Sequence, residues 1–347
     1  MNVALVGAGV IAVRYAECIR AQPRLTLLGA TDPLPGRAAA LGAADYPSLD
    51  ALLADDAVEL VVVLTPPSLH AAVAGAALEA GKHVYSEKPL ALDPDEARSL
   101  VELAQRAGVR LSSAPGTLLG EAQQTAWKFV REGGVGEVRV VYAEANWGRI
   151  ESWHPTPESL YDVGPFTDVG VYPLTILAAM FGPIRLVTAY AKMIAPDRMR
   201  KDGLPFALSG PDFYVAVLEH EGGVVTRLTA SFWVSPSKQR GLEFHGDSGS
   251  LWMPTWEQFD SRLERTVDGE TYTSVPYVRE PYKGVDWARA LVDLADAVRD
   301  GRPHRLSAEL AAHVVEVLAA VRASAAGAGT VEVGSRFTPP QPVDWAQ

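Results

Sequence analysis

Residues 2–12 read NVALVGAGVIA, and this stretch decides the fold. A short aliphatic run ends at Gly7 and Gly9, and Ala12 completes the spacing G-x-G-x-x-A. In this pattern the first glycine permits a tight turn, the second lets the backbone approach a pyrophosphate, and the small third residue allows close packing of helix on strand. The helix that opens here would direct its N-terminal N–H groups at phosphates. The stretch therefore predicts a strand, a dinucleotide-binding turn and a helix.

A second aliphatic run, LTLLGATD at 25–32, ends in Asp32. An acidic residue about 20 positions after the glycines accepts hydrogen bonds from the ribose hydroxyls of a dinucleotide. A 2′-phosphate would meet this carboxylate, so NAD is favoured, while Arg37 keeps NADP possible. Asp32 also begins an Asp-Pro turn that any loop can use, and both interpretations are open. The predicted contacts of the turn are Gly7, Gly9, Val10, Ile11 and Asp32.

Aliphatic runs alternate with alanine-rich segments over residues 1–118. Runs such as LVVVLT at 60–65 and KHVYSE at 82–87 are separated by helical patterns such as HAAVAGAALEAG at 70–81. Continuous apolar runs joined by helices of about 12 residues indicate parallel strands covered on both faces. We therefore expect residues 1–118 to form an α/β domain with a doubly wound parallel sheet of the Rossmann type.

The pattern changes after residue 118 to longer strands with alternation and hairpin signals. The clearest is FYVAVLEHEGGVVTRLTASFWV at 213–234, in which Gly222 and Gly223 predict a two-residue turn. Two helical patterns, at 285–301 and 307–327, should pack on a sheet face. We expect an α+β domain with an antiparallel sheet at 119–335. The proline-rich residues 336–347 form a predicted tail that lies on a neighbouring molecule or on nothing.

Composition excludes several classes of function. The chain has 347 residues, of which 31 are basic and 42 acidic, and the net charge of -11 disfavours binding to nucleic acid or to an anionic membrane. The single cysteine, Cys18, excludes an intrachain disulfide and fits the cytoplasm. No basic leader precedes the apolar N-terminus, and prolines interrupt the longest uncharged runs. The histidines are scattered without ligand spacing, so no metal site is predicted.

Three motifs together resemble the Gfo/Idh/MocA oxidoreductases. The first is the glycine turn. The second, TPPSLHAAVAGAALEAGKHVYSEKPLAL at 65–92, is similar to the long Thr-Pro to Glu-Lys-Pro signature of that family. The third, GPFTDVGVYPLTIL at 164–177, resembles the Asp-x-Gly-x-His segment with Tyr172 in place of the histidine. The resemblance implies a Rossmann domain followed by a large open-faced, mainly antiparallel sheet, and a homodimer or homotetramer formed through that sheet.

The resemblance also implies site residues. Thr65, Pro66 and His70 would line the cofactor, and Glu87 and Lys88 would lie next to its nicotinamide half. Pro67 stands where asparagine is usual, and the Lys-Pro peptide is commonly cis in this family.

The position and charge of the Glu-Lys-Pro triplet predict a catalytic role independently of the resemblance. Ligands of an open parallel sheet bind beyond the carboxyl ends of its strands, where Glu87 and Lys88 would project. When hydride leaves a carbon that bears a hydroxyl, a cation beside the oxygen stabilises the developing negative charge, and Lys88 could supply it. Glu87 would influence how readily Lys88 shares its proton. The alternative is an exposed Glu-Lys pair before a helix.

Asp168 and Tyr172 have the i, i+4 spacing of one helix face, although Pro173 would interrupt such a helix. A phenol has a pKa of about 10, which a neighbouring lysine lowers, so Tyr172 could exchange a proton with Lys88 while Asp168 orients a hydroxyl. Tyr172 could instead be a core aromatic residue. Trp153 and His154 could contact a sugar or could belong to a packed loop.

The function predicted first is hydride transfer between NAD or NADP and a sugar, inositol or related polyol, with Lys88, Tyr172 and Asp168 as catalytic residues. One alternative is an NAD-dependent glycosidase that acts by transient oxidation and elimination. Another is a nucleotide-bound sensor without turnover.

Overall fold

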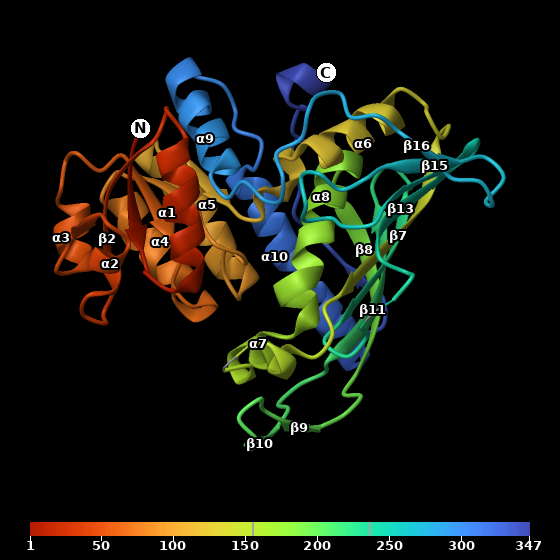
Figure 1. The fold of residues 1–347 in the computed structure, drawn as a ribbon, viewed down its shortest axis with the longest axis horizontal. Coiled ribbons are helices and arrows are strands. Elements are labelled where there is room, and N and C mark those ends of the chain that lie inside the picture. Colours follow the sequence, from red (N-terminus) through yellow and green to blue (C-terminus); the bar gives the residue numbers. More distant parts are fainter. Residues whose placement is uncertain (155, 236) are drawn as a thin grey trace. The chain divides into compact units, whose positions relative to one another are not determined.

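The computed structural model describes residues 1–154, 156–235 and 237–347 and is drawn in Figure 1. The chain divides into two compact units, the first comprising Met1–Leu119 with Asp286–Val315 and the second Gly120–Val285 with Glu316–Gln347. The predicted division at 118 did not include the return of the chain to the first unit. This return is held by long-range contacts: the Ser112 hydroxyl donates to the Leu306 carbonyl oxygen at 2.8 Å, and Arg24 pairs with Asp296.

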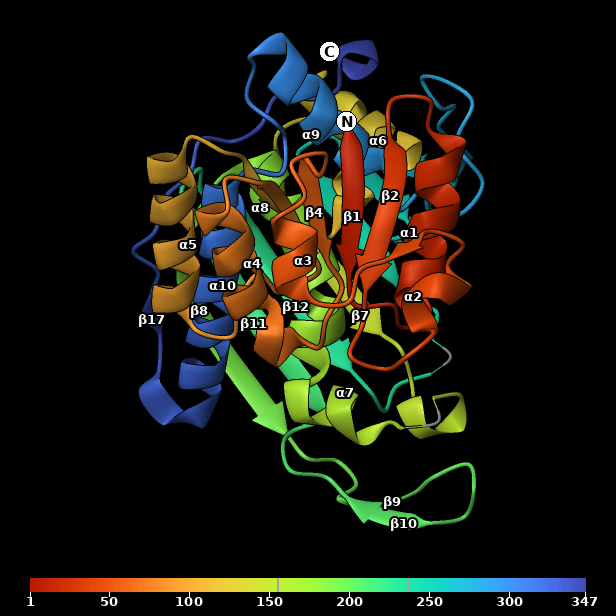
Figure 2. The same cartoon turned by 90° about the vertical axis from the view of Figure 1, so that its left-hand side faces the viewer.

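The first unit contains a six-stranded, all-parallel sheet in the order β3-β2-β1-β4-β5-β6, which confirms the predicted Rossmann arrangement. Figure 2 shows β4, β1 and β2 side by side, with α1 next to them. The strands are β1 (Asn2–Val6), β2 (Thr26–Thr31), β3 (Ala44–Asp45), β4 (Leu60–Val63), β5 (His83–Ser86) and β6 (Leu111–Ser113). The edge strand β3 was not predicted, because two residues carry no apolar pattern.

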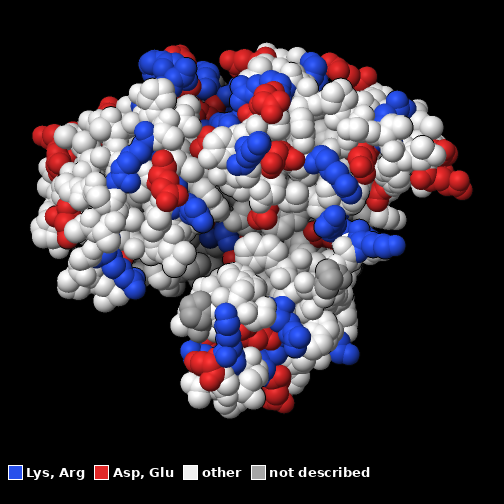
Figure 3. All heavy atoms as spheres, viewed as in Figure 1, with Lys and Arg blue, Asp and Glu red and all other residues white. Residues whose placement is uncertain are grey.

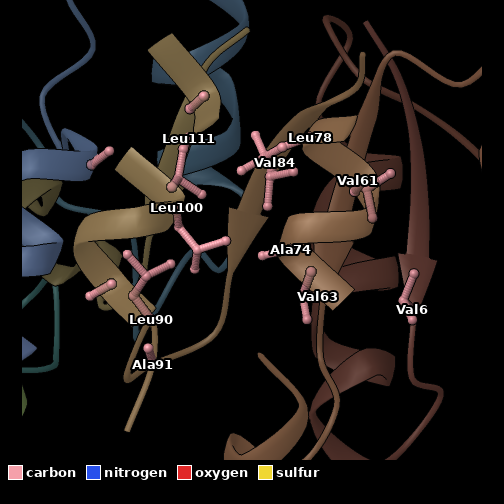
Figure 4. Packing of buried hydrophobic residues seen from close by; sticks show 14 of the residues in the cluster. Val6, Val61, Val63, Ala74, Leu78, Val84, Leu90, Ala91, Leu100 and Leu111 are labelled. Carbon is pink, nitrogen blue, oxygen red and sulfur yellow. The ribbon is translucent and has the colours of Figure 1, made fainter. Parts of the chain in front are cut away.

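Helices cover both faces of this sheet. They are α1 (Val10–Ala21), α2 (Arg37–Ala40), α3 (Leu49–Leu53), α4 (His70–Glu79), α5 (Pro94–Ala107), α9 (Arg289–Asp300) and the beginning of α10 (Ala308–Ala323), with short 3-10 turns η1 (Pro67–Leu69) and η2 (Gly116–Leu119). On one face Val61, Val63 and Val84 pack against Leu78 of α4 and Leu100 of α5 (Figure 4). The burial of these strands on both faces explains why they read as continuous apolar runs.

The second unit is built on a nine-stranded sheet in the order β16-β15-β14-β13-β7-β12-β11-β8-β17. The strands β7 and β12 pair in parallel, and the other described neighbours are antiparallel, which confirms the mainly antiparallel prediction. The strands are β7 (Val138–Asn146), β8 (Ile184–Lys192), β11 (Phe213–His220), β12 (Val225–Ser231), β13 (Gly241–Gly246), β14 (Gly249–Met253), β15 (Glu264–Thr266), β16 (Thr273–Ser274) and β17 (Val331–Glu332). The hairpin of β9 (Asp197–Met199) and β10 (Pro205–Ala207) is separate.

One face of the large sheet is covered by helices and the other is largely open. The helical segments are α6 (Glu121–Arg131), η3 (Ile150–Ser152), α7 (Glu158–Val163), the π-helical turn η4 (Phe166–Gly170), α8 (Val171–Phe181), the remainder of α10 and the turn η5 (Ser324–Ala328). On the covered face, a Cβ at Gly170 would lie 3.4 Å from Ala230 of β12. On the opposite face Tyr142, Tyr190 and Val217 are 40%, 59% and 46% exposed.

The C-terminal residues do not behave as the predicted tail. The 3-10 turn η6 (Asp344–Ala346) lies against α6, where Lys128 Nζ donates to the Gln347 carbonyl oxygen at 2.7 Å. The guanidinium of Arg279 lies over the Trp345 ring, and its Cζ is 4.2 Å from the ring centroid. The expectation that this segment lies on a neighbour or on nothing is therefore wrong: it folds back onto its own unit.

Two surface properties bear on the class of protein. Among the described helices, one stretch, Ala308–Ala328, is long and apolar enough to span a membrane, and half of its most apolar window is buried inside the protein. On the face drawn in Figure 3, basic and acidic side chains are interspersed. On this face, the mixture is not that of an extended basic groove.

Candidate functional site

The glycine turn at the end of β1 has the geometry that the sequence predicts. Gly7 has a φ of 98°, and a Cβ there would lie 2.7 Å from the Leu64 carbonyl oxygen, so only glycine fits. Gly9 has no atom within 4 Å of its virtual Cβ. The helix α1 begins at Val10 without a side-chain cap and without an acidic residue in its first turn. The turn therefore leaves open space in front of unpaired N–H groups, which suits a pyrophosphate.

Asp32 lies directly beside this turn. Its Oδ2 accepts a hydrogen bond from Ala8 N at 2.8 Å, and its Oδ1 accepts one from Leu34 N at 2.9 Å. The second bond is the Asp-Pro turn that was one of the two interpretations. The first joins the carboxylate to the glycine turn, and the contact of Asp32 with a ribose stays a prediction. Val10 is 91% exposed beside the turn, and Ile11 is half-buried.

The predicted Thr65, Pro66 and His70 follow β4. Thr65 Oγ1 is buried and has no hydrogen-bond partner among the described residues, so it fits a contact with a bound nucleotide. Pro66 is exposed and precedes η1. His70 is buried, and its Nδ1 and Nε2 lie 2.7 Å from the Pro89 carbonyl oxygen and 2.8 Å from the Thr65 carbonyl oxygen. His70 thus joins two loops, and its contact with the cofactor stays a prediction.

Glu87 and Lys88 follow the end of β5, and the Lys88–Pro89 peptide is cis, as the resemblance implies. Glu87 is 9% exposed. Its Oε1 accepts a hydrogen bond of 2.7 Å from the Tyr15 hydroxyl, and its Oε2 accepts one of 3.1 Å from Lys88 N. Both oxygens therefore have partners within the protein, and a contact between Glu87 and the cofactor stays a prediction. Lys88 is half-buried. Sequence reasoning missed Tyr15.

Asp168 and Tyr172 lie in one continuous helical segment of the second unit. Asp168 belongs to η4 and Tyr172 to α8, and both are buried, at 7% and 8% exposure. Pro173 has no N–H to bond the carbonyl four residues earlier, and the π-helical turn accommodates this loss without ending the helix. The Tyr172 ring packs on Trp256, with ring centroids 4.8 Å apart. Trp256 in turn donates from Nε1 to the Glu144 carbonyl oxygen at 3.1 Å.

Trp153 and His154 belong to an aromatic loop in the second unit. The ring of Trp153 lies 5.7 Å from that of Trp147 and 5.5 Å from that of His154, both edge to face. Trp153 is 50% exposed, and His154 Nδ1 accepts from Thr156 N at 3.2 Å. The structure therefore brings the two predicted residues together and adds Trp147. Pro155, which follows them in the sequence, lies outside the described residues.

Glu257 follows Trp256 directly and was not predicted. Burial raises the pKa of this carboxyl group, while the Gln258 amide, 3.3 Å away, opposes the shift. A carboxyl group with a raised pKa, next to the residue that packs on Tyr172, is a candidate proton donor or acceptor. No sequence motif marks it. Within the described ranges, no group of three or more His, Cys, Asp or Glu residues could hold a metal ion.

Both units match models of a single protein family. Residues 1–114 match the model described as an oxidoreductase family with an NAD-binding Rossmann fold, and residues 123–252 match its C-terminal domain. The chain belongs to the Gfo/Idh/MocA oxidoreductase family. The resemblance inferred from the three motifs is confirmed, and the first unit is an NAD-binding Rossmann domain whose open turn, orphan Thr65 hydroxyl and Asp32 fit that coenzyme.

Individual Gfo/Idh/MocA relatives are distant. An uncharacterised oxidoreductase of Rhizobium meliloti is 31% identical over 50% of this chain and 49% of its own length, so the chain spans about half of that relative. UDP-N-acetylglucosamine 3-dehydrogenase of Acidithiobacillus ferrooxidans is 29% identical over 71% of this chain and 72% of that protein. A structure of levoglucosan dehydrogenase with NADH and levoglucosan has a TM-score of 0.84 at 19% identity and covers 96% of this chain and 100% of that one, which shows the shared fold.

Proposed function

We propose that this protein transfers a hydride between NAD and a hydroxyl or carbonyl group of a sugar, inositol or related polyol. The observation that carries the proposal is the placement of Lys88 in the first unit, just beyond the carboxyl end of β5, where ligands of such a sheet bind. The names of distant relatives that act on a nucleotide sugar and on levoglucosan support the substrate class.

In the first unit, we assign several residues to coenzyme binding and one residue, Lys88, to catalysis. The glycine turn, Val10, Ile11, Asp32, Thr65 and Pro66 would hold the coenzyme, which when bound accepts or supplies the hydride. The Lys88 ammonium would stabilise negative charge on the substrate oxygen as the carbonyl forms. Glu87, held by Tyr15, accepts the hydrogen bond of Lys88 N and so fixes the backbone that carries the ammonium.

In the second unit, we assign the exchange of the hydroxyl proton to Tyr172 and the orientation of that hydroxyl to Asp168. The Tyr172 ring packs on that of Trp256, which supports a defined position of the phenol. Asp168 is an acceptor when ionised and would bind a substrate hydroxyl. Trp153 and His154, with Trp147, present exposed ring surface of the kind that packs against the apolar face of a sugar ring.

The decisive experiment is an NADH-absorbance screen of sugars and cyclic polyols, repeated on three variants. We expect Lys88→Ala to lower turnover by about 100-fold or more and Tyr172→Phe by about 10-fold or more. The exposed Lys192→Ala should retain full turnover. Full activity in Lys88→Ala would refute the assignment of Lys88. Release of an aglycone without net NADH would instead indicate the glycosidase, and nucleotide binding without any turnover would indicate a sensor.

Coenzyme choice is tested by Asp32→Asn. Removal of the negative charge should weaken NADH binding and shift the ratio of NADPH to NADH affinity by about tenfold toward NADPH. Equal affinity of the unchanged protein for the two coenzymes would contradict the argument for NAD.

We further propose that the protein is cytoplasmic and that the open face of the large sheet joins copies of the chain in a dimer or tetramer. Tyr142, Tyr190 and Val217 on that face would be covered. Light scattering should show an oligomer that Val217→Lys dissociates, and a monomeric unchanged protein would contradict this assembly.

A further inference from the structure

Tyr15 and Glu87 meet because the side-chain alternation along β5 and the helical period of α1 direct both residues to the same side of the sheet. In β5 the side chain of Tyr85 points to the face of the sheet that α1 covers, and Glu87, two residues on, lies on the same side. In α1 the buried face comprises Ala12, Tyr15, Ala16 and Ile19. Tyr15 and Tyr85 therefore pack together, with ring centroids 6.2 Å apart, and the Tyr15 hydroxyl reaches the Glu87 carboxylate at 2.7 Å.

The Tyr15 ring contacts two other aromatic rings, those of Tyr85 and Trp287. Trp287 belongs to the segment that returns to the first unit, and its ring centroid lies 5.6 Å from that of Tyr15. Tyr15 is only 1% exposed. Burial and the neighbouring Glu87 carboxylate raise the pKa of Tyr15 well above its ordinary value. The phenol therefore keeps its proton at all working pH values and acts as a fixed donor.

Glu87 connects the Tyr15 hydroxyl to the backbone of Lys88 through its two carboxylate oxygens. Its Oε2 accepts the hydrogen bond of Lys88 N at 3.1 Å, while its Oε1 is fixed by Tyr15. A carboxylate anchored at one oxygen has little freedom to rotate and so holds the backbone N–H at the other. The helix α1 is the one that begins at the glycine turn.

We propose that Tyr15 is a positioning residue for Lys88, which it holds through Glu87 and so ties to the helix that opens at the coenzyme turn. This rests on the proposed role of Lys88. Tyr15 is 1% exposed, so we assign it no direct contact with coenzyme or substrate. It acts by restricting the backbone from which the ammonium is aimed, so its loss should reduce turnover more than coenzyme binding.

The test is Tyr15→Phe in the full chain, with Tyr46→Phe as a matched control. Tyr46 also donates from its phenol to a carboxylate, that of Asp55, but Tyr46 follows the edge strand β3 and Asp55 lies between α3 and β4, so neither residue belongs to the loop of Lys88. The first measurement is hydrogen exchange of the Lys88 amide with and without NADH, which requires no substrate. We expect exchange to be about tenfold faster in Tyr15→Phe and unchanged in Tyr46→Phe.

The second measurement is kinetic and uses the sugar or polyol that the screen identifies. We expect turnover to fall about tenfold in Tyr15→Phe, while the NADH dissociation constant stays within about twofold. An unchanged Lys88 amide, or faster exchange throughout α1 and β5 alike, would overturn the positioning role. Full turnover in Lys88→Ala with an altered amide in Tyr15→Phe would instead refute only the proposed function.

Discussion

His70 Nδ1 lies 2.7 Å from the carbonyl oxygen of Pro89, and through its other ring nitrogen the same residue reaches the Thr65 carbonyl oxygen at 2.8 Å. One buried imidazole therefore joins the loop after β4 to the loop after β5. These loops carry Thr65 and Lys88, so the side chain that holds them together determines the spacing of the proposed coenzyme contacts.

Replacing His70 with alanine should loosen both loops. We expect a loss of about 1–3 kcal/mol in the free energy of unfolding, because a buried carbonyl oxygen loses its N–H donor, and a fall of about tenfold in NADH affinity. Urea unfolding and NADH fluorescence titration measure the two effects. His245→Ala, in the second unit, should leave NADH affinity unchanged. Loss of stability without loss of affinity would show that His70 is only structural.

Gly7 and Gly9 should respond differently to the same change. Gly7→Ala places a Cβ 2.7 Å from the Leu64 carbonyl oxygen at a φ of 98°, so it should destabilise the first unit by about 2 kcal/mol or more and abolish NADH binding. Gly9→Ala meets no atom within 4 Å and should change stability by less than about 0.5 kcal/mol. It should still weaken NADH binding about tenfold, because its methyl group occupies the space of the pyrophosphate. Unaltered NADH binding in Gly9→Ala would mean that the coenzyme lies elsewhere.

Local sequence was enough for the glycine turn, for the strands of the Rossmann sheet other than β3 and for the position of the hairpin at Gly222, because period, spacing and turn chemistry are properties of neighbouring residues. The turn of that hairpin has three residues, 221–223, and not the two that were predicted, since His220 N donates to the Val224 carbonyl oxygen. Asp168 and Tyr172 lie on one helical segment, which the sequence had left open because Pro173 would interrupt such a helix. The π-helical turn was not predicted, since a proline in a helix can be accommodated in several ways.

Partners distant in the chain could not be predicted. Tyr15 and Glu87 are 72 residues apart, and the local patterns give the face on which each lies but not the residue it meets. Trp256 and Glu257 lie in a loop after β14 with no motif, so only the folded sheet brings Trp256 to Tyr172. The return of Asp286–Val315 to the first unit depends in the same way on contacts such as that between Tyr15 and Trp287.

Acid should weaken the second unit through His220. Burial lowers the pKa of this histidine from 6.5 to about 4, so the folded state binds its proton less tightly than the unfolded state. Its contribution to stability is therefore complete above about pH 6.5, declines as the pH falls from about 6.5 toward 4, and reaches a loss of about 3 kcal/mol. His220→Gln should be less stable than the unchanged protein near neutral pH but should lose less on acidification. Equal losses, measured by urea unfolding at about pH 7 and about pH 4.5, would contradict this assignment.

Two arginines of the β9–β10 hairpin differ in burial, so their replacement by alanine should lower the free energy of unfolding by different amounts. Arg198 is 5% exposed; its Nη1 donates to Glu151 at 2.9 Å, its Nη2 to Asp212, and its Nε to the Ala195 carbonyl oxygen at 2.8 Å. Arg198→Ala leaves two buried carboxyl groups without this partner and should cost about 3–5 kcal/mol.

Arg200 provides the matched control within the same hairpin. It is partly buried and pairs at 3.3 Å and 3.1 Å with the exposed carboxylates of Glu158 and Asp202, which water can solvate when the arginine is removed, so Arg200→Ala should cost less than about 1 kcal/mol. Both are measured by urea unfolding of the full chain. Because Glu151 lies in the turn that leads to Trp153, Arg198→Ala should also raise the KM for the sugar or polyol, whereas Arg200→Ala should not. Similar costs for the two variants would mean that the buried ion pairs contribute no more than exposed ones do.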